Sequence, residues 1–377
     1  MRFLSLSLLL PLVAGHTTFT TLYVDGVNQG DGVCVRMNRD VSTATFPIEP
    51  LANRAMACGY DGEKAVTRVC SANSTSTLTF EFRDYPDASS PGSIDPSHRG
   101  PCAVYMKRVD DATEDNNAAG DGWFKIWELG YDSPSGKWCT EKLIDNNGLL
   151  SVEIPADIRG GDYLVRPELL ALQSAQDTPR DPQFYVGCAQ VFVQSDGDAQ
   201  PETVSIDENT YNLDMEALTY NIFETPLKLP YPSFGPAVYT PGSANRSGGS
   251  TERKATESVQ TKGLKPEGCI LVRDDWCGFE VPSYDTQDGC WASSKHCWDQ
   301  SDVCWHTALP TGNKNCEIWQ QKCTTIDDNC SSGDWVGPPN AGKDLTPVAG
   351  KMDGSMKIFT RGTAMNLHRR RRVAGHA

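Results

Sequence analysis

The spacing of fourteen cysteines constrains the fold of this 377-residue chain more than any other feature. The cysteines fall into a group of six and a later group of eight. Two even counts are what two separately closed sets of disulfides require. Disulfides persist in oxidising compartments, which favours a secreted, extracellular protein. The two groups are Cys34, Cys58, Cys70, Cys102, Cys139 and Cys188, and then Cys269, Cys277, Cys290, Cys297, Cys304, Cys316, Cys323 and Cys330.

The two groups are separated by residues 241–265, a stretch rich in Ser, Thr, Gly and Lys that has no aromatic residue. Such a segment cannot bury enough apolar surface to order itself, so we expect a flexible linker. It divides the chain into a first domain, residues 16–240, and a cysteine-rich module, residues 266–340. Residues 341–377 end in LHRRRRVAGHA and are predicted to form a basic, disordered tail.

Residues 1–15 have the features of a secretory signal peptide: one Arg, a leucine-rich run too short to span a bilayer, and Ala-Gly before the expected cleavage point. No later run approaches the length of a membrane span, so no anchor is expected. The net charge of −15 disfavours nucleic acid as a partner. Sequons at Asn73, Asn245 and Asn329 are compatible with N-glycosylation of a secreted protein.

Short runs that alternate between apolar and polar residues fill the first domain. This period-2 pattern, interrupted by Gly, Pro, Asp and Asn clusters, predicts an all-β, immunoglobulin-like or fibronectin-like antiparallel β-sandwich. The stretches 26–65, 107–122 and 200–240 lack the pattern and are expected to be long loops, where functional surfaces commonly lie. The runs are TTLYVDG, STLTFEFRDY, CAVYMKRV, WFKIWELGY, LLSVEIP, DYLVRPELLAL and QFYVGCAQVFV.

The cysteine-rich module has a different period. Its cysteines repeat twice as C-x6-C-x6-C, and a seven-residue step returns to nearly the same face of an α-helix. We therefore predict a small, disulfide-stapled α-helical hairpin; the alternative is a loop-rich knot in which the equal spacing is accidental. Trp291, Trp298 and Trp305 each follow a cysteine and would form a row on the first helix. This row would serve either as core or as a platform for sugar rings.

His16 would become the first residue of the mature chain if cleavage follows Gly15. Its α-amine would then lie within chelating reach of its own imidazole Nδ1, and His98, in the turn-rich GSIDPSHRGP, offers another nitrogen. Gln183 and Tyr185 stand two residues apart on a predicted strand and so share a face. Three nitrogens with a weak tyrosine oxygen suit Cu(II), whereas zinc requires a fourth strong ligand. The alternative is that the position of His16 is coincidental and His98 is an ordinary surface residue.

The chain from His16 to about Tyr239 resembles a fungal lytic polysaccharide monooxygenase of auxiliary-activity family nine, formerly glycoside hydrolase family 61. Residues 266–340 resemble a cysteine-rich appendage found on some members of that family. The matching features, in order, are His16, IDPSHRGPCAVYMKRV, GWFKIWELG, DYLVRPELLAL and QFYVGCAQVFV.

The resemblance implies a copper ion held by the amine and ring of His16 and by the ring of His98, with Tyr185 axial. It also implies a flat active face made by loops and a Cys58–Cys188 disulfide. The implied activity is oxidative cleavage of β-1,4-glucan, chiefly cellulose, at C1 or C4. The implied partners are O2 or H2O2 and an external electron donor, either a small reductant or a cellobiose dehydrogenase-like protein. A monomer is expected.

Further positions follow from the same resemblance. Gln183 would hydrogen-bond the oxygen co-substrate. Gln173 stands where most members carry a histidine, and Gln cannot exchange a proton near neutral pH. The supply of protons is therefore in question, unless Gln173 is simply a polar residue at a strand end. Tyr23 and Tyr231 are candidates for stacking on sugar rings, with a place in the core as the alternative.

Two other classes of function compete with this interpretation. A secreted copper- or carbohydrate-binding protein without redox turnover would keep the same ligands, and the Gln173 replacement is the feature that favours it. A glycoside hydrolase would need a pair of carboxylates, and no spacing in the sequence suggests such a pair.

Overall fold

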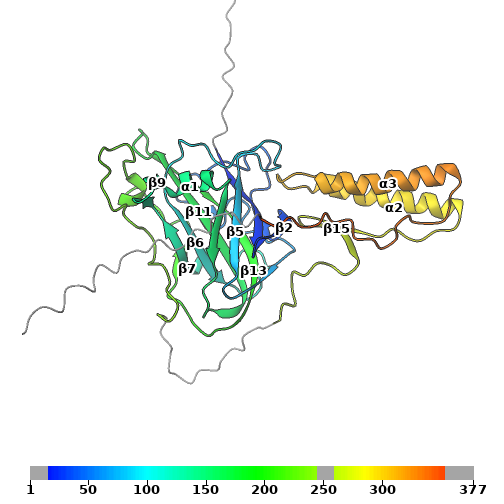
Figure 1. The fold of residues 1–377 in the computed structure, drawn as a ribbon, viewed down its shortest axis with the longest axis horizontal. Helices are drawn as coiled ribbons and strands as arrows, with labels where there is room; N and C mark the ends of the chain where they lie inside the picture. The colour runs from blue at the N-terminus through cyan, green and yellow to red at the C-terminus, as the bar shows by residue number, and fades with distance from the viewer. Residues whose placement is uncertain (1–15, 244–258, 353–377) are drawn as a thin grey trace, which may run out of the picture.

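The computed structural model describes residues 16–243 and 259–352. It consists of a two-sheet β-sandwich from which a helical hairpin projects to one side (Figure 1). This arrangement confirms the predicted fold class. No helix in these two ranges is long and apolar enough to cross a membrane. The predicted signal peptide, the Asn245 sequon and the arginine-rich segment lie outside the described residues.

The smaller sheet contains β1 (Thr18–Val24), β2 (Val27–Asp31), β5 (Thr77–Arg83) and β10 (Leu149–Glu153). Its order is β10-β5-β1-β2, and all neighbours are antiparallel. Leu78, Phe80 and Phe82 alternate along β5 and are all buried. Because side chains alternate between the two faces of a strand, this pattern turns one face of the sheet to the core.

The larger sheet has the main order β14-β7-β6-β11-β13-β3, with β12 paired to β11 and β4 paired to β13. One pair departs from the predicted antiparallel arrangement, because β4 runs parallel to β13. These two strands are far apart in the sequence, and a parallel pair requires such a long connection. The strands are β3 (Val35–Arg36), β4 (Cys70–Asn73), β6 (Cys102–Arg108), β7 (Gly120–Leu129), β11 (Arg159–Ser174), β12 (Asp181–Val186), β13 (Cys188–Asp196) and β14 (Val204–Ile206).

The two sheets close on a large apolar core that includes Phe19, Phe80, Val104, Ile126 and Val165. Three disulfides tie the loops to the sheets, and one of them is the pairing that the family resemblance implies. They are Cys34–Cys70, Cys58–Cys188 and Cys102–Cys139. The remaining short elements are η1 (Arg54–Met56), β8 (Tyr131–Asp132), β9 (Lys137–Trp138), α1 (Cys139–Asp145) and η2 (Glu216–Thr219).

The cysteine-rich module is a β-ribbon followed by an antiparallel pair of helices. The ribbon is formed by β15 (Cys269–Arg273) and β16 (Trp276–Phe279), and the helices are α2 (Gln287–His306) and α3 (Lys314–Ser332). All six helix cysteines are buried and paired across the two helices, which confirms the stapled hairpin rather than the knot. The pairs are Cys290–Cys330, Cys297–Cys323 and Cys304–Cys316, and Cys269–Cys277 closes the ribbon.

The described end of the expected linker, residues 259–265, lies against the sandwich. Lys262 Nζ is 2.6 Å from the Asp111 carboxylate, and the Val69 N–H donates to the Gly263 carbonyl at 2.9 Å. Gln260 also donates to the Val69 carbonyl. These contacts satisfy polar groups on both sides, so this end of the segment is ordered despite its low apolar content.

The start of the expected disordered tail, residues 341–352, is also ordered. The Asn28 N–H donates to the Gly350 carbonyl at 3.0 Å, and the Met352 N–H donates to the Gly26 carbonyl at 2.9 Å. Val27 and Lys351 form an antiparallel bridge. Because β2 is an edge strand with unpaired backbone groups, a following segment of the chain can add to it. The composition of the segment did not reveal this edge.

Candidate metal centre

Three aromatic side chains from separate parts of the sandwich meet. His16 precedes β1, His98 lies in the loop before β6, and Tyr185 is on β12. The ring centroids of His16 and His98 are 6.1 Å apart, with their planes at 83°. The Tyr185 ring is 6.1 Å from His16 and 6.0 Å from His98. The structure therefore brings together the three residues that the sequence analysis selected as metal ligands.

A local turn and a strand hold these rings in place. The Ser97 N–H donates to the Asp95 side chain at 2.8 Å, and the His98 N–H donates to the Asp95 carbonyl at 2.9 Å. Aspartate commonly stabilises turns in this way, and here the turn sets the direction of the His98 side chain. On β12, strand alternation places Tyr185 and Gln183 on the same face.

The buried Nε2 of His98 makes no hydrogen bond of ordinary geometry, although the Gln183 side chain is close enough to act on the pKa of His98. Its Nδ1 lies 3.2 Å from the Ser97 hydroxyl. Buried polar atoms nearly always have a partner, so such an Nε2 beside a second imidazole is the pattern expected of a metal ligand. Burial lowers the pKa of both His16 and His98 below the usual histidine value. A lower pKa favours the neutral imidazole, which is the form that binds metals.

Within the described residues, no group of three or more His, Cys, Asp and Glu side chains is positioned to hold a metal ion. The α-amine of His16 becomes available as a third nitrogen if the chain is cleaved after Gly15. Two imidazoles, one amine and a phenol oxygen form the N and O donor set that copper prefers. A zinc site would require a fourth strong ligand. The residues present therefore fit one copper ion.

Two glutamines and an aspartate continue a hydrogen-bond network that starts at the Tyr185 hydroxyl. Gln183 Oε1 accepts from the Tyr185 hydroxyl at 2.9 Å and from Gln173 Nε2 at 2.7 Å. Gln183 Nε2 in turn donates to Asp181 at 2.8 Å. Burial, together with the Asp181 and Glu49 carboxylates, raises the pKa of Tyr185, so the phenol is neutral. Its proton is directed to Gln183, which leaves the lone pairs of the Tyr185 oxygen free.

The two tyrosines selected for sugar contact are placed elsewhere. Tyr231 packs its half-buried ring against Trp138 and Tyr220 at 5.3 and 5.2 Å, and its hydroxyl donates to the Ala217 carbonyl. Tyr23 is near the far end of β1, about 23 Å from His16 along an extended strand. Its hydroxyl donates to Glu81 at 2.7 Å. The structure does not bring Tyr23 to the three rings, and it gives Tyr231 the contacts of a packed side chain.

Two exposed phenylalanines, one beside His16 and one beside Arg99, were missed by the sequence analysis. Phe46 is 50% exposed, and its ring lies 5.2 Å from that of His16. Phe223 is 58% exposed and lies 5.4 Å from the guanidinium of Arg99, the residue after His98. Both phenylalanines belong to stretches that the sequence marked as long loops. Nothing in those stretches distinguished these two rings from other aromatic residues.

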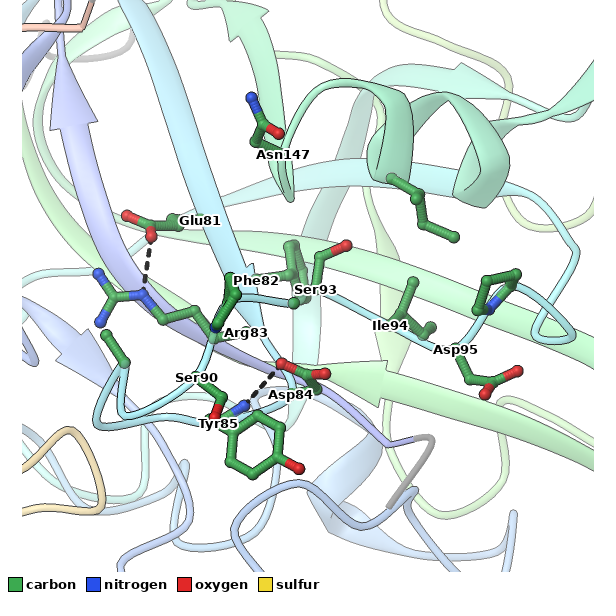
Figure 2. A pocket seen from close by; sticks show the side chains of 15 residues that line it. Glu81, Phe82, Arg83, Asp84, Tyr85, Ser90, Ser93, Ile94, Asp95 and Asn147 are labelled. Carbon is green, nitrogen blue, oxygen red and sulfur yellow. Dashed lines mark hydrogen bonds and ion pairs between the residues drawn. The ribbon is translucent and has the colours of Figure 1, made fainter. Parts of the chain in front are cut away.

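A pocket lies beside the loop that carries His98 (Figure 2). It is lined by the end of β5, by residues of the segment 88–96, and by Ile144 and Asn147. Figure 2 shows the Glu81–Arg83 ion pair and the hydrogen bond from the Tyr85 N–H to Asp84. His16, His98 and Tyr185 do not line this pocket. The three rings are therefore not part of this pocket.

The fold is a β-sandwich that brings two imidazoles and a tyrosine together as a candidate metal site. Comparisons with known proteins show the family to which it belongs. The model of Auxiliary Activity family 9 (formerly GH61) matches residues 16–231. The AA9 family lytic polysaccharide monooxygenase A of Emericella nidulans is 66% identical over 366 residues, which cover 97% of this chain and 64% of that protein. The AA9 family lytic polysaccharide monooxygenase C of Aspergillus tamarii is 64% identical over 354 residues, covering 94% and 95%.

Among solved structures, the one named CvAA9A superposes with a TM-score of 0.52 at 32% identity, covering 59% of this chain and 98% of that one. The chain belongs to auxiliary-activity family 9, the lytic polysaccharide monooxygenases, which are oxidoreductases. The resemblance seen in the sequence is thereby confirmed. Because the chain spans 64% of the length of the Emericella protein, the activity of that whole protein is not transferred to it directly.

Proposed function

We propose that the protein is a secreted, copper-dependent monooxygenase that cleaves β-1,4-glucan chains, cellulose above all, by oxidation at C1 or C4. The observation that carries the proposal is the meeting of His16, His98 and Tyr185 with a buried Nε2 on His98 that makes no hydrogen bond of ordinary geometry. Family membership supports the reaction class.

The residues have separate tasks in this proposal. The amine and ring of His16 and the ring of His98 would hold the copper ion, with the Tyr185 oxygen as a further, weaker ligand. A copper ion there would supply one-electron chemistry between an external electron donor and O2 or H2O2, for oxidation of the sugar. Gln183 would orient the oxygen co-substrate, and Gln173 fixes Gln183 through the 2.7 Å hydrogen bond.

Sugar contact is assigned to two exposed rings, one next to His16 and one next to Arg99. Phe46 beside His16 and Phe223 beside Arg99 offer apolar faces for stacking on sugar rings. Tyr231 and Tyr23 are packed or remote, so they are weaker candidates for this contact than the two phenylalanines.

The remaining assignments follow from the sequence. Secretion with cleavage after Gly15 supplies the free amine of His16, and a small reductant or a cellobiose dehydrogenase-like protein would supply electrons. Asn73 is exposed at the end of β4, which suits glycosylation better than the half-buried Asn329 on α3. We propose a monomer, because each ligand of the centre comes from one chain.

The test is to measure soluble oxidised oligosaccharides released from cellulose with ascorbate, comparing copper-loaded with copper-stripped protein. Oxidised products are expected only from the loaded protein, and His98→Ala should abolish them. Electron paramagnetic resonance and the intact mass of the N-terminus check the ligand set and the cleavage point. A copper signal without oxidised products would favour the non-catalytic binding protein. Neutral reducing-end products without reductant would indicate a hydrolase.

A further inference from the structure

One side of α2 carries three tryptophans that the metal centre does not use. Trp291 is 42% exposed and Trp305 is 36% exposed, and Trp298 between them is half-buried. We propose that these three rings form a binding platform for an extended β-1,4-linked glucan. The choice of glucan as the ligand rests on the proposed function of the sandwich.

Only the middle ring of the row, Trp298, packs against the core of the hairpin. The interior between α2 and α3 is filled by the three disulfides together with Trp319 and Ile326, which are fully buried. Trp298 lies over the seam between the helices, where its indole Nε1 donates to Asp327 on α3 at 2.9 Å. This hydrogen bond fixes the middle ring, while the two outer rings remain exposed. Of the two alternatives left open by the sequence, the structure favours the platform.

The spacing of the rings suits a regular polymer. Seven residues of α-helix advance about 10.5 Å, and the direction of the side chain drifts by only about 20° per step. An extended β-1,4-linked chain turns each sugar over relative to the last, so every second sugar presents the same apolar face. Rings separated by about the length of a disaccharide can therefore stack on alternate sugars of one chain.

The residues between the rings are polar. Lys295 and Asp302 lie on the same stripe of α2 as the tryptophans, and both are exposed. Lys295 is paired with Asp299 at 2.7 Å. Apolar rings separated by hydrogen-bonding groups suit a ligand whose sugar faces are apolar and whose edges carry hydroxyls. A protein partner would be favoured by a continuous apolar face, and the net charge of −15 disfavours nucleic acid.

The module that carries the platform contacts the sandwich directly, through the turn between β15 and β16 and through the residues that follow α2. Asp275 accepts hydrogen bonds from the N–H and the hydroxyl of Thr67 at 2.7 and 3.1 Å. Leu309, which follows α2, packs into the core cluster of the sandwich. Two sites joined in this way can engage the same insoluble polymer, so binding at one raises the effective concentration at the other.

The experiment measures binding isotherms of the full-length, copper-stripped protein on microcrystalline cellulose without reductant. The double variant Trp291→Ala/Trp305→Ala is expected to bind about tenfold more weakly than the wild type. Two controls should bind like the wild type: Trp335→Ala, an equally exposed tryptophan outside the row, and Val303→Ser, on another face of α2. Unchanged binding of the double variant to cellulose overturns the proposal. The same isotherms on chitin test the choice of ligand: if the double variant binds chitin more weakly than the wild type but binds cellulose equally well, the row is not a glucan platform.

A second measurement uses only the wild type, so it does not depend on the folding of the variants. Cellohexaose should protect Trp291 and Trp305, but not Trp335, from oxidation by N-bromosuccinimide, as read by peptide mass spectrometry. Equal oxidation with and without the sugar would contradict the platform. Neither assay requires copper or turnover, so a protein that binds normally but releases no oxidised sugar would contradict the proposed function alone.

Discussion

The β-sandwich and the helical hairpin are stabilised in different ways. The sandwich packs large apolar side chains from two sheets and uses three disulfides for its loops. The module that contains the hairpin uses four disulfides, and cysteines occupy half of the buried positions of its helices. A small unit buries too little apolar surface to fold on packing alone, so covalent links replace part of the core.

The two regions also build their surfaces differently. The candidate metal centre combines residues 16, 98 and 185, which only the folded sheets bring together. The tryptophan row arises within one helix, from the same seven-residue period that sets the cysteines. The sandwich therefore loses its site when long-range packing changes, whereas the hairpin keeps its row for as long as α2 remains helical.

The largest effect is expected from adding one residue before His16. The extension removes the α-amine as a chelating ligand and leaves His98 and Tyr185 in place. Loss of a direct ligand should weaken copper binding by at least about a hundredfold and stop the release of oxidised sugars. Calorimetry and electron paramagnetic resonance measure this loss. Binding to cellulose through the tryptophan row should persist, and an unchanged copper spectrum would contradict the ligand set.

Removing the central staple tests the other region. The double variant Cys297→Ser/Cys323→Ser should destabilise the hairpin by about 2–5 kcal/mol, since the cross-link limits the unfolded chain. Hydrogen exchange should accelerate in α2 and α3, while β1, β11 and the copper spectrum stay unchanged. The matched control is Cys102→Ser/Cys139→Ser, which should loosen the sandwich instead. Equal acceleration in both regions would show that they unfold as one unit.

The junction between the regions should respond to pH. Burial raises the pKa of Asp274 to about 6, although Arg273 lies 2.7 Å away, and the Asp275 carboxylate also raises it. A carboxyl with a raised pKa in the folded state stabilises that state below its unfolded pKa and loses this contribution as pH rises through about 6. The junction should therefore be weaker at pH 7.5 than at pH 4, by about 3 kcal/mol at most.

This pH dependence can be measured by hydrogen exchange of β15 at the two pH values. Asp274→Asn removes the titrating group and should show a smaller difference in junction stability between the two pH values than the wild type. The comparison between wild type and variant cancels the titration of other carboxyls. If the two proteins show the same pH dependence, Asp274 does not control the junction.

Local periodicity made the two architectures predictable from the sequence. Alternating runs located the main strands, and the cysteine step located both helices of the hairpin. The ends of the units were less predictable, since the order of residues 259–265 and 341–352 depends on the edge of β2 and on the Lys262–Asp111 contact. The buried Arg166–Glu168 ion pair also escaped detection, because polar residues within a strand usually indicate an exposed face.

The residues of the candidate metal centre could be selected because histidine is rare in this chain and all three residues occupy recognisable motifs. The sugar-contact residues were not, because an aromatic residue in a long loop is exposed or buried according to how the loop folds. Phe46 and Phe223 became candidates only through their positions beside His16 and Arg99. Tyr23, chosen for its closeness in sequence to His16, lies near the other end of the same strand.

The smallest effect is expected inside the sandwich, at Gln173. This side chain donates to Gln183, and its own Oε1 is buried without a partner. Gln173→His keeps a donor at this position and adds a group that can exchange protons near pH 6.5. We expect turnover to rise a few-fold and to acquire a pH dependence near that value, measured as oxidised sugar released across pH 5–8. Gln173→Ala, the control, removes one hydrogen bond and should leave the pH profile of the wild type unchanged. A Gln173→His profile that matches the wild type would mean that Gln173 only positions Gln183 and that protons reach the centre by another route.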